Sequence, residues 1–208
     1  MDQPPEPSPA QGTAAPKHLS TPDLYVLSAA TAVVTANAYY IHPIIAVVAD
    51  DFGISHAMIG MVPAFNQIAL ALGILLLLPL GDWVSNRRLT GIFVAAQFVS
   101  VAVMAFAQDY WLFVAGSTVL GFFTIAPYLL PTYVSKRVAP GDLGKATAII
   151  TTGIIAGILL ARAGAGVMGQ YLGWRSVYFV AAALMLAVSV ALPLIMEKRD
   201  SRTVAAPG

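Results

Sequence analysis

The stretch AMIGMVPAFNQIALALGILLLLPL at residues 57–80 decides the fold class, because it contains no charged side chain. A helix of about 20 apolar residues crosses the hydrocarbon core of a bilayer, which is roughly 30 Å thick. This stretch is long enough to do so. Backbone N–H and C=O groups cannot stay unpaired in lipid, so we expect the stretch to be a transmembrane helix.

Five more apolar runs follow the same pattern, and short connections with charged or turn-forming residues separate them. The composition agrees, since 58% of the residues are hydrophobic and only 10% are charged. A soluble domain carries about 25% charged residues. The sequence therefore predicts an all-α membrane protein with six transmembrane helices. The other five runs cover residues 24–49, 89–107, 111–134, 146–169 and 176–196.

Basic residues gather on one side of the predicted spans. If the N-terminus is cytoplasmic, the connections on the far side carry mainly the acids Asp50, Asp51 and Asp109. The positive-inside rule then makes both termini cytoplasmic. We expect a disordered tail at residues 1–20, a six-helix domain at 21–197 and a second tail at 198–208. The basic residues on the inside are Lys17, Arg87, Arg88, Lys136, Arg137, Lys145, Lys198, Arg199 and Arg202.

Composition and motifs argue against several functions. A net charge of +1 gives no reason to expect nucleic acid as a partner, and the absence of cysteine removes disulfides and thiolate metal sites. The sequence has no cluster of metal ligands, no nucleophile motif and no pair of catalytic carboxylates. The glycines at 153, 157, 164 and 166 have spacings that suit close helix packing. We therefore expect a protein that is not an enzyme and uses no cofactor.

The connection after the second run reads GDWVSNRRL, residues 81–89, and holds an acid followed by two bases. Asp82 lies near the C-terminal end of a predicted helix, where the helix dipole disfavours negative charge. Arg87 and Arg88 are the nearby side chains that can compensate it. The alternative is that the arginines only anchor the chain at the cytoplasmic surface and that Asp82 is incidental.

A Gly-Asp pair followed by a turn and paired basic residues resembles the signature loop of the major facilitator superfamily. Two further stretches, ANAYYIHP at residues 36–43 and GILLAR at residues 157–162, resemble a bacterial branch grouped with drug/proton antiporters. Gly173-Trp174-Arg175 before the sixth run is a widespread feature of the superfamily. The resemblance covers about residues 20–197.

The sequence departs from the family pattern at four positions. Leu78 and Trp83 stand where a glycine and a basic residue are usual in the signature loop. In the fourth run, Ser117 takes the place of an arginine found in many proton-coupled members. In the fifth, Ile158 replaces the proline of the antiporter motif. Proton antiport is therefore a weaker expectation than transport.

The resemblance implies an inner-membrane protein with one half of the twelve-helix fold, which transports a small solute by alternating access. In the family the loop cluster, here Gly81, Asp82, Arg87 and Arg88, latches the cytoplasmic gate. Six helices make only one half, so we expect a second copy or a separate C-terminal half as partner within the lipid bilayer. The alternatives are a truncated membrane fragment that does not transport, and a scaffold or regulator of another membrane protein.

Polar residues inside the predicted spans are candidates for a substrate cavity, because polar groups are costly in lipid. In the first run, Asn37, Tyr40 and Pro43 recur at three-residue steps, which places them on one side. The resemblance puts the first and fourth helices around the central cavity, whereas interhelical hydrogen bonding is the alternative for each residue. The candidate cavity residues are Asn37, Tyr40, His42, Thr124, Tyr128 and Arg162.

Arg162 is the only basic residue placed inside a span. A cation at the bilayer centre costs about 2.5–3.5 kcal/mol on insertion scales, so a functional role would justify its presence. It lies roughly 10 Å from the outer end of its run. Snorkelling of the side chain to the membrane surface is therefore an equally good explanation.

Overall fold

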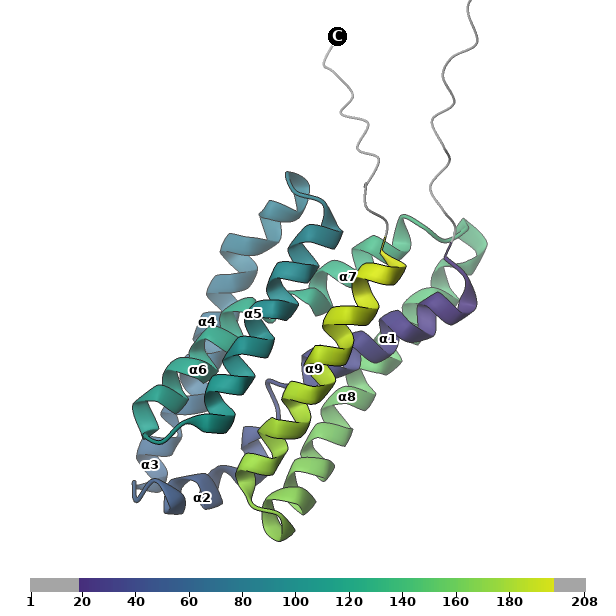
Figure 1. Cartoon of the computed structure of the whole chain (residues 1–208). Coiled ribbons are helices and arrows are strands. Elements are labelled where there is room, and N and C mark those ends of the chain that lie inside the picture. Colours follow the sequence, from purple (N-terminus) through teal and green to yellow (C-terminus); the bar gives the residue numbers. More distant parts are fainter. Residues whose placement is uncertain (1–18, 197–208) are drawn as a thin grey trace, which may run out of the picture.

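The computed structural model describes residues 19–196, which are helical over most of their length (Figure 1). Six helices in this range are long and apolar enough to cross a membrane, so the predicted six-span, all-α fold is confirmed. The predicted tails fall almost wholly outside the described residues, as does the side chain of Asp82, and the sidedness of the termini stays a prediction. The spans are Thr21–Asp51, His56–Gly81, Asn86–Phe106, Tyr110–Ser135, Pro140–Tyr171 and Trp174–Ile195.

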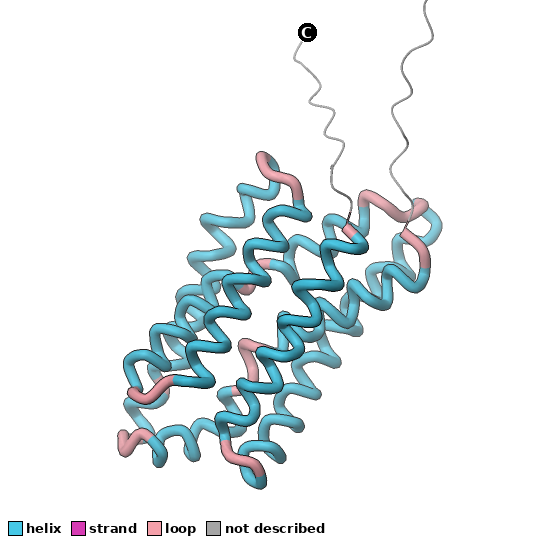
Figure 2. The backbone as a smooth tube through the Cα atoms, in the orientation of Figure 1, coloured by secondary structure: helices cyan, strands magenta, loops and turns pink. Residues whose placement is uncertain are grey.

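Spans 1 and 4 are each interrupted near their middle. Figure 2 shows these interruptions as short non-helical turns inside the bundle. The elements in chain order are α1 (Thr21–Ala36), α2 (Ile41–Asp51), α3 (His56–Ile59), α4 (Met61–Leu77), the 3₁₀ helix η1 (Leu78–Asp82), α5 (Asn86–Phe106), α6 (Tyr110–Phe123), α7 (Ala126–Ser135), the 3₁₀ helix η2 (Pro140–Asp142), α8 (Leu143–Tyr171) and α9 (Trp174–Ile195).

Local sequence sets the start of the first span. The hydroxyl of Ser20 accepts a hydrogen bond from the backbone N–H of Asp23 at 3.4 Å. The carboxylate of Asp23 accepts one in return from the backbone N–H of Ser20 at 3.0 Å. This reciprocal pair is a capping box, which satisfies N–H groups that the first turn of a helix leaves open. Pro22 fits in that turn because it has no N–H to satisfy.

Prolines explain the two interruptions. Pro127 has no N–H to donate to the carbonyl of Phe123, four residues earlier, and α6 ends at Phe123. Thr124 then takes a ψ of 53°, outside the helical region, before α7 begins. In span 1, Pro43 likewise leaves the carbonyl of Tyr39 without its helical partner. A turn separates α1 from α2 at that level.

Close contacts at glycine hold the bundle together. A Cβ at Gly157 of α8 would clash with the backbone of Ala32 in α1, and a Cβ at Gly121 of α6 would clash with the backbone of Asn66 in α4. Small residues let helix backbones approach in this way, which is a main source of association energy in membranes. α5 packs against α6 and α9, and α9 in turn packs against α1 and α8. The pair of α4 and α6 is joined in this way to the pair of α1 and α8 (Figure 1).

Candidate functional site

The two interrupted helices meet through the side chain of Gln97 in α5. Its amide nitrogen donates to the carbonyl of Phe123, where α6 ends, at 2.9 Å. Its amide oxygen accepts from the side-chain nitrogen of Asn37, where α1 ends, at 3.4 Å. Gln97 is fully buried. A buried amide must be paired, so this residue links both turns and fixes them relative to each other.

Three of the predicted cavity residues are enclosed by the bundle. Asn37, Tyr40 and Thr124 expose only 3%, 8% and 4% of their surface. The hydroxyl of Thr124 donates to the carbonyl of Leu120 in its own helix at 2.7 Å. Asn37 makes the interhelical hydrogen bond that was the alternative to a cavity role. A part of these three residues in substrate binding stays a prediction.

The other three predicted cavity residues, His42, Tyr128 and Arg162, are exposed on the surface of the bundle. The expected grouping of Tyr40 with Pro43 on one side is not found, because Tyr40 is buried and Pro43 is exposed. The turn between α1 and α2 interrupts the three-residue repeat on which that grouping depended. The structure therefore divides the predicted residues into a buried set and an exposed set.

Arg162 of α8 lies against the interruption of span 1. Its Cζ atom is 5.5 Å from the centroid of the Tyr39 ring, which is within reach of a cation–π interaction. The His42 ring stacks near Tyr39, with ring centroids 5.7 Å apart and planes inclined by 27°. Tyr39 was not among the predicted site residues. Its proximity to Arg162 depends on how α8 packs on span 1, which residue spacing within one helix does not reveal.

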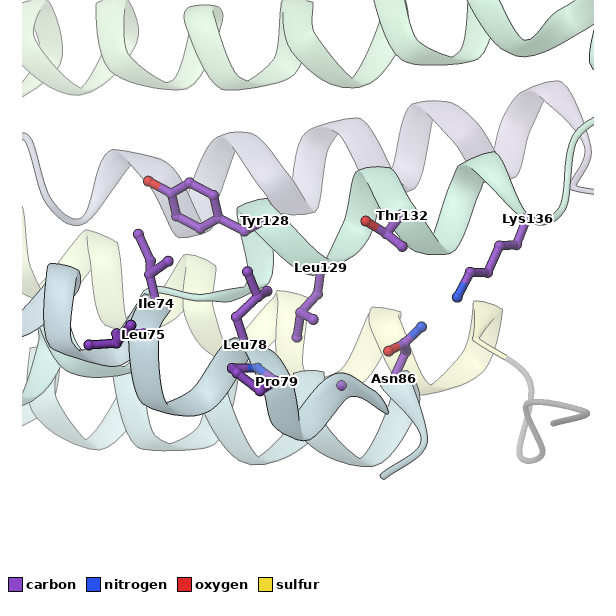
Figure 3. A pocket seen from close by; sticks show the side chains of 10 residues that line it. Ile74, Leu75, Leu78, Pro79, Asn86, Tyr128, Leu129, Thr132 and Lys136 are labelled. Atoms are coloured by element: carbon purple, nitrogen blue, oxygen red, sulfur yellow. The ribbon is translucent and has the colours of Figure 1, made fainter. Parts of the chain in front are cut away.

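A second polar region is a cavity of about 510 Å³ at one end of the bundle, between α4 with η1 and α7. Its apolar wall is formed mainly by α4 and η1, and α7 supplies most of its polar groups. The signature-loop residue Gly81 also lines it. Figure 3 shows the side chains of Tyr128 and Thr132 on α7, that of Lys136 just after α7 ends and, across the cavity, those of Ile74, Leu78 and Pro79.

The predicted gate residues lie around the junction of η1 and α5. Gly81 and Asp82 end η1, and Arg87 and Arg88 stand in the first turn of α5. The two arginines line a groove of about 640 Å³ that also includes Pro193 of α9. Gly81 faces the other cavity, toward α7. The predicted latch between Asp82 and these arginines stays a prediction.

Sequence reasoning did not identify the ion pair at the opposite end of the bundle. Arg175 donates to the carboxylate of Asp51 at 2.7 Å and to the carbonyl of Ala107 at 3.1 Å. Its guanidinium also lies 4.2 Å from the centroid of the Trp174 ring. In the sequence Arg175 stands out only as part of a family motif, and its partners come from two other connections. The pair is partly exposed, so its contribution to stability is about 0–1 kcal/mol.

The described residues share the features of one class of protein. Within residues 19–196, no group of three or more His, Asp or Glu side chains is placed to hold a metal ion. Six spans, two of them interrupted beside exposed polar side chains, are typical of multi-pass membrane transporters. The family model of the Major Facilitator Superfamily matches residues 27–208. The chain belongs to this superfamily, and the predicted resemblance is confirmed.

Curated relatives agree with this assignment. "Uncharacterized transporter YgaY" of Escherichia coli O157:H7 is 33% identical over 189 residues, which cover 90% of this chain and 48% of the relative. "Probable transporter SCO4007" of Streptomyces coelicolor is 29% identical over 181 residues, which cover 86% of this chain and 42% of the relative. The chain thus spans about half the length of the curated relatives it matches.

Proposed function

We propose that this chain works as one six-helix half of a secondary transporter of the inner membrane, and not as an enzyme. The observation that carries this proposal is that His42, Tyr128 and Arg162 lie within spans and yet are exposed on the bundle surface. Polar and charged groups are costly against lipid. A second half enclosing a water-filled cavity would remove these side chains from the lipid.

The mechanism we propose is alternating access of a small solute to a site beside the interrupted helices. Interrupted helices in transporters free backbone groups for binding near the middle of the membrane. Gln97 joins both interruptions through hydrogen bonds, so spans 1 and 4 would move as one body. This body would rock against the second half, and the cluster of Asp82, Arg87 and Arg88 would open and close on the cytoplasmic side.

The second half is either another copy of this chain or a separately encoded C-terminal half. Two samples in lipid nanodiscs and proteoliposomes separate these cases. One holds this chain alone, and the other holds it with the C-terminal half of the Escherichia coli O157:H7 relative. Mass measurement reports the assembly, and uptake of labelled sugars, amino acids, nucleosides and carboxylates reports transport.

We expect uptake from at least one of these samples above that of empty vesicles. Uptake by a dimer of this chain alone supports the self-paired transporter. Uptake only after addition of the second half supports the separate partner. A folded chain that moves none of these solutes in either sample would contradict transport and favour a membrane fragment or a scaffold.

A further inference from the structure

We infer that Arg162 and Tyr39, with His42 stacked near Tyr39, form a binding site for an oxyanion. The transported solute would then carry a carboxylate or phosphate group. This inference rests on the proposed transport function and names the chemical class of its substrate. The three side chains come from two spans, because Arg162 belongs to α8 while Tyr39 and His42 lie at the interruption of span 1.

The position of Arg162 is set by the packing of α8 on span 1. Gly157, before it, packs on Ala32. Gly166, after it, faces Pro43, where an added Cβ would lie 3.5 Å from the proline ring. Arg162 therefore lies at the level of the turn between α1 and α2. From there α8 continues to Tyr171, a further rise of about 14 Å.

The distance of Arg162 from the end of α8 distinguishes a solute site from an anchor at the membrane surface. A side chain that snorkels extends along its helix toward the lipid headgroups. The guanidinium of Arg162 instead lies over the ring of Tyr39 on the neighbouring span. Its charge is thus held beside the interrupted helix, on the exposed surface of the bundle. The same oxyanion chemistry could come from a lipid phosphate, and the experiment below distinguishes the two sources.

No acid offsets this charge within the described spans. Arg162 has no hydrogen bond or ion pair with any residue in the range 19–196, so its five N–H donors are open to a ligand. The acids in that range all stand at or next to helix ends, and they are Asp23, Asp50, Asp51, Asp82, Asp109 and Asp142. An uncompensated arginine inside a membrane is expected to bind an anion and to repel a cation.

The chemistry of the cluster favours an oxyanion. The Tyr39 ring lies 5.5 Å from the Cζ atom of Arg162, and a cation–π contact at this distance uses no N–H donor of the guanidinium as a hydrogen-bond partner. The N–H donors point outward in the guanidinium plane, where they can form two parallel hydrogen bonds to a carboxylate or phosphate. The His42 ring stacks near Tyr39 on the same span. Tyr39 is thus a positioning residue, and Arg162 is the residue that contacts the ligand.

The test uses three probes of similar size and different charge. They are 4-methylbenzoate, the neutral 4-methylbenzamide and the cation 4-methylbenzylammonium. Binding to the full chain in phosphatidylcholine nanodiscs is measured by saturation-transfer NMR, with empty nanodiscs as background. The variants are Arg162→Gln, Arg162→Lys, Tyr39→Phe and Tyr39→Leu. The matched control is Lys145→Gln, which removes one exposed positive charge from the same helix.

We expect 4-methylbenzoate to bind at least about tenfold more tightly than the other two probes, and Arg162→Gln to remove that preference. Lys145→Gln should leave it unchanged. Tyr39→Phe keeps the ring and should have a small effect, whereas Tyr39→Leu should weaken binding clearly. If Arg162→Gln does not insert, Arg162→Lys takes its place in the test. Lysine keeps the charge and loses the two-pronged geometry, so the preference for 4-methylbenzoate should weaken.

Three results would overturn the inference. The first is equal or tighter binding of the cation, and the second is benzoate binding that survives Arg162→Gln. The third is complete loss of benzoate binding in phosphatidylglycerol nanodiscs, which would assign the site to a lipid headgroup. Benzoate binding without uptake of any solute would contradict the transport proposal but leave the oxyanion site standing. Uptake of a cation that does not depend on Arg162 would contradict the oxyanion site but leave the transport proposal standing.

Discussion

Asp82 is the single residue on which the proposed gate depends. Replacing Asp82 with Asn removes the negative charge and keeps the size of the side chain. Charge-assisted hydrogen bonds are worth about 1.5–3 kcal/mol, so we expect solute uptake to fall by at least about tenfold. Insertion should be unaffected, since the residue lies in a connection at the end of η1. The measurement is uptake per amount of inserted protein. Asp142→Asn, in another connection on the same predicted side, is the control, and equal uptake by both variants would refute the role of Asp82.

Gln97 is the residue whose loss should separate the two interrupted helices. Gln97→Leu keeps the volume of the buried side chain but leaves the Asn37 amide without its partner and removes the bond to Phe123. Leaving a buried polar group unpaired costs about 1–3 kcal/mol. The free energy of unfolding in detergent should fall by about that amount. Ser100→Ala is the control on α5, because the hydroxyl of Ser100 bonds only within its own helix. Equal stability of the two variants would contradict a linking role.

Single residues also show where the sequence stops being informative. Arg162 could be predicted as unusual from its type and place, because a charge inside an apolar run is costly. Its neighbour Tyr39 could not be predicted, because the contact depends on the packing of two spans. Gln97 gave no signal either, since one amide in an apolar run does not reveal its partner. The site's exposed charge was therefore predictable, and the side chains that position it were not.

At the scale of elements, the contact of α8 with α1 should be sensitive to a single methyl group. Gly157→Ala places a Cβ against the backbone of Ala32, so the two helices must move apart. Gly164→Ala, on the same helix, meets no atom within 4 Å. We expect the first change to lower the unfolding free energy by about 1–3 kcal/mol. The second should be neutral or raise it by up to about 1 kcal/mol. A thermal unfolding series on both variants checks this, and the opposite order would contradict the packing.

The spans themselves were predictable because the bilayer imposes a simple length and polarity rule. The second run was expected at residues 57–80, and the structure has the span at His56–Gly81. The turns inside spans 1 and 4 do not follow from this rule. Periodicity assumes an unbroken helix, and the turn at Thr124 shifts the face of every later residue. This is why Thr124 is buried while Tyr128, one helical turn further on, is exposed.

At the scale of the whole molecule, burial within the bundle is uneven. Spans 1 and 4 are mostly buried among the other helices, whereas spans 2 and 5 are mostly exposed. Apolar exposed residues are satisfied by lipid, so exposure alone does not indicate a partner. Exposed polar groups within spans do indicate a partner. Two of them, Tyr128 and Arg162, lie on spans 4 and 5. The proposed second half would therefore cover both of these residues.

A cysteine placed at Tyr128 tests whether water reaches that side. The chain contains no cysteine, so Tyr128→Cys introduces the only thiol. Tyr128 is 45% exposed and lines the cavity beside α7. Maleimides react with the thiolate, which forms in water and not in lipid. We expect a water-soluble maleimide to label this variant at least about tenfold faster than Val190→Cys, on the apolar face of α9. Equal slow labelling of both would mean that lipid covers Tyr128, and the proposed cavity would have to be abandoned.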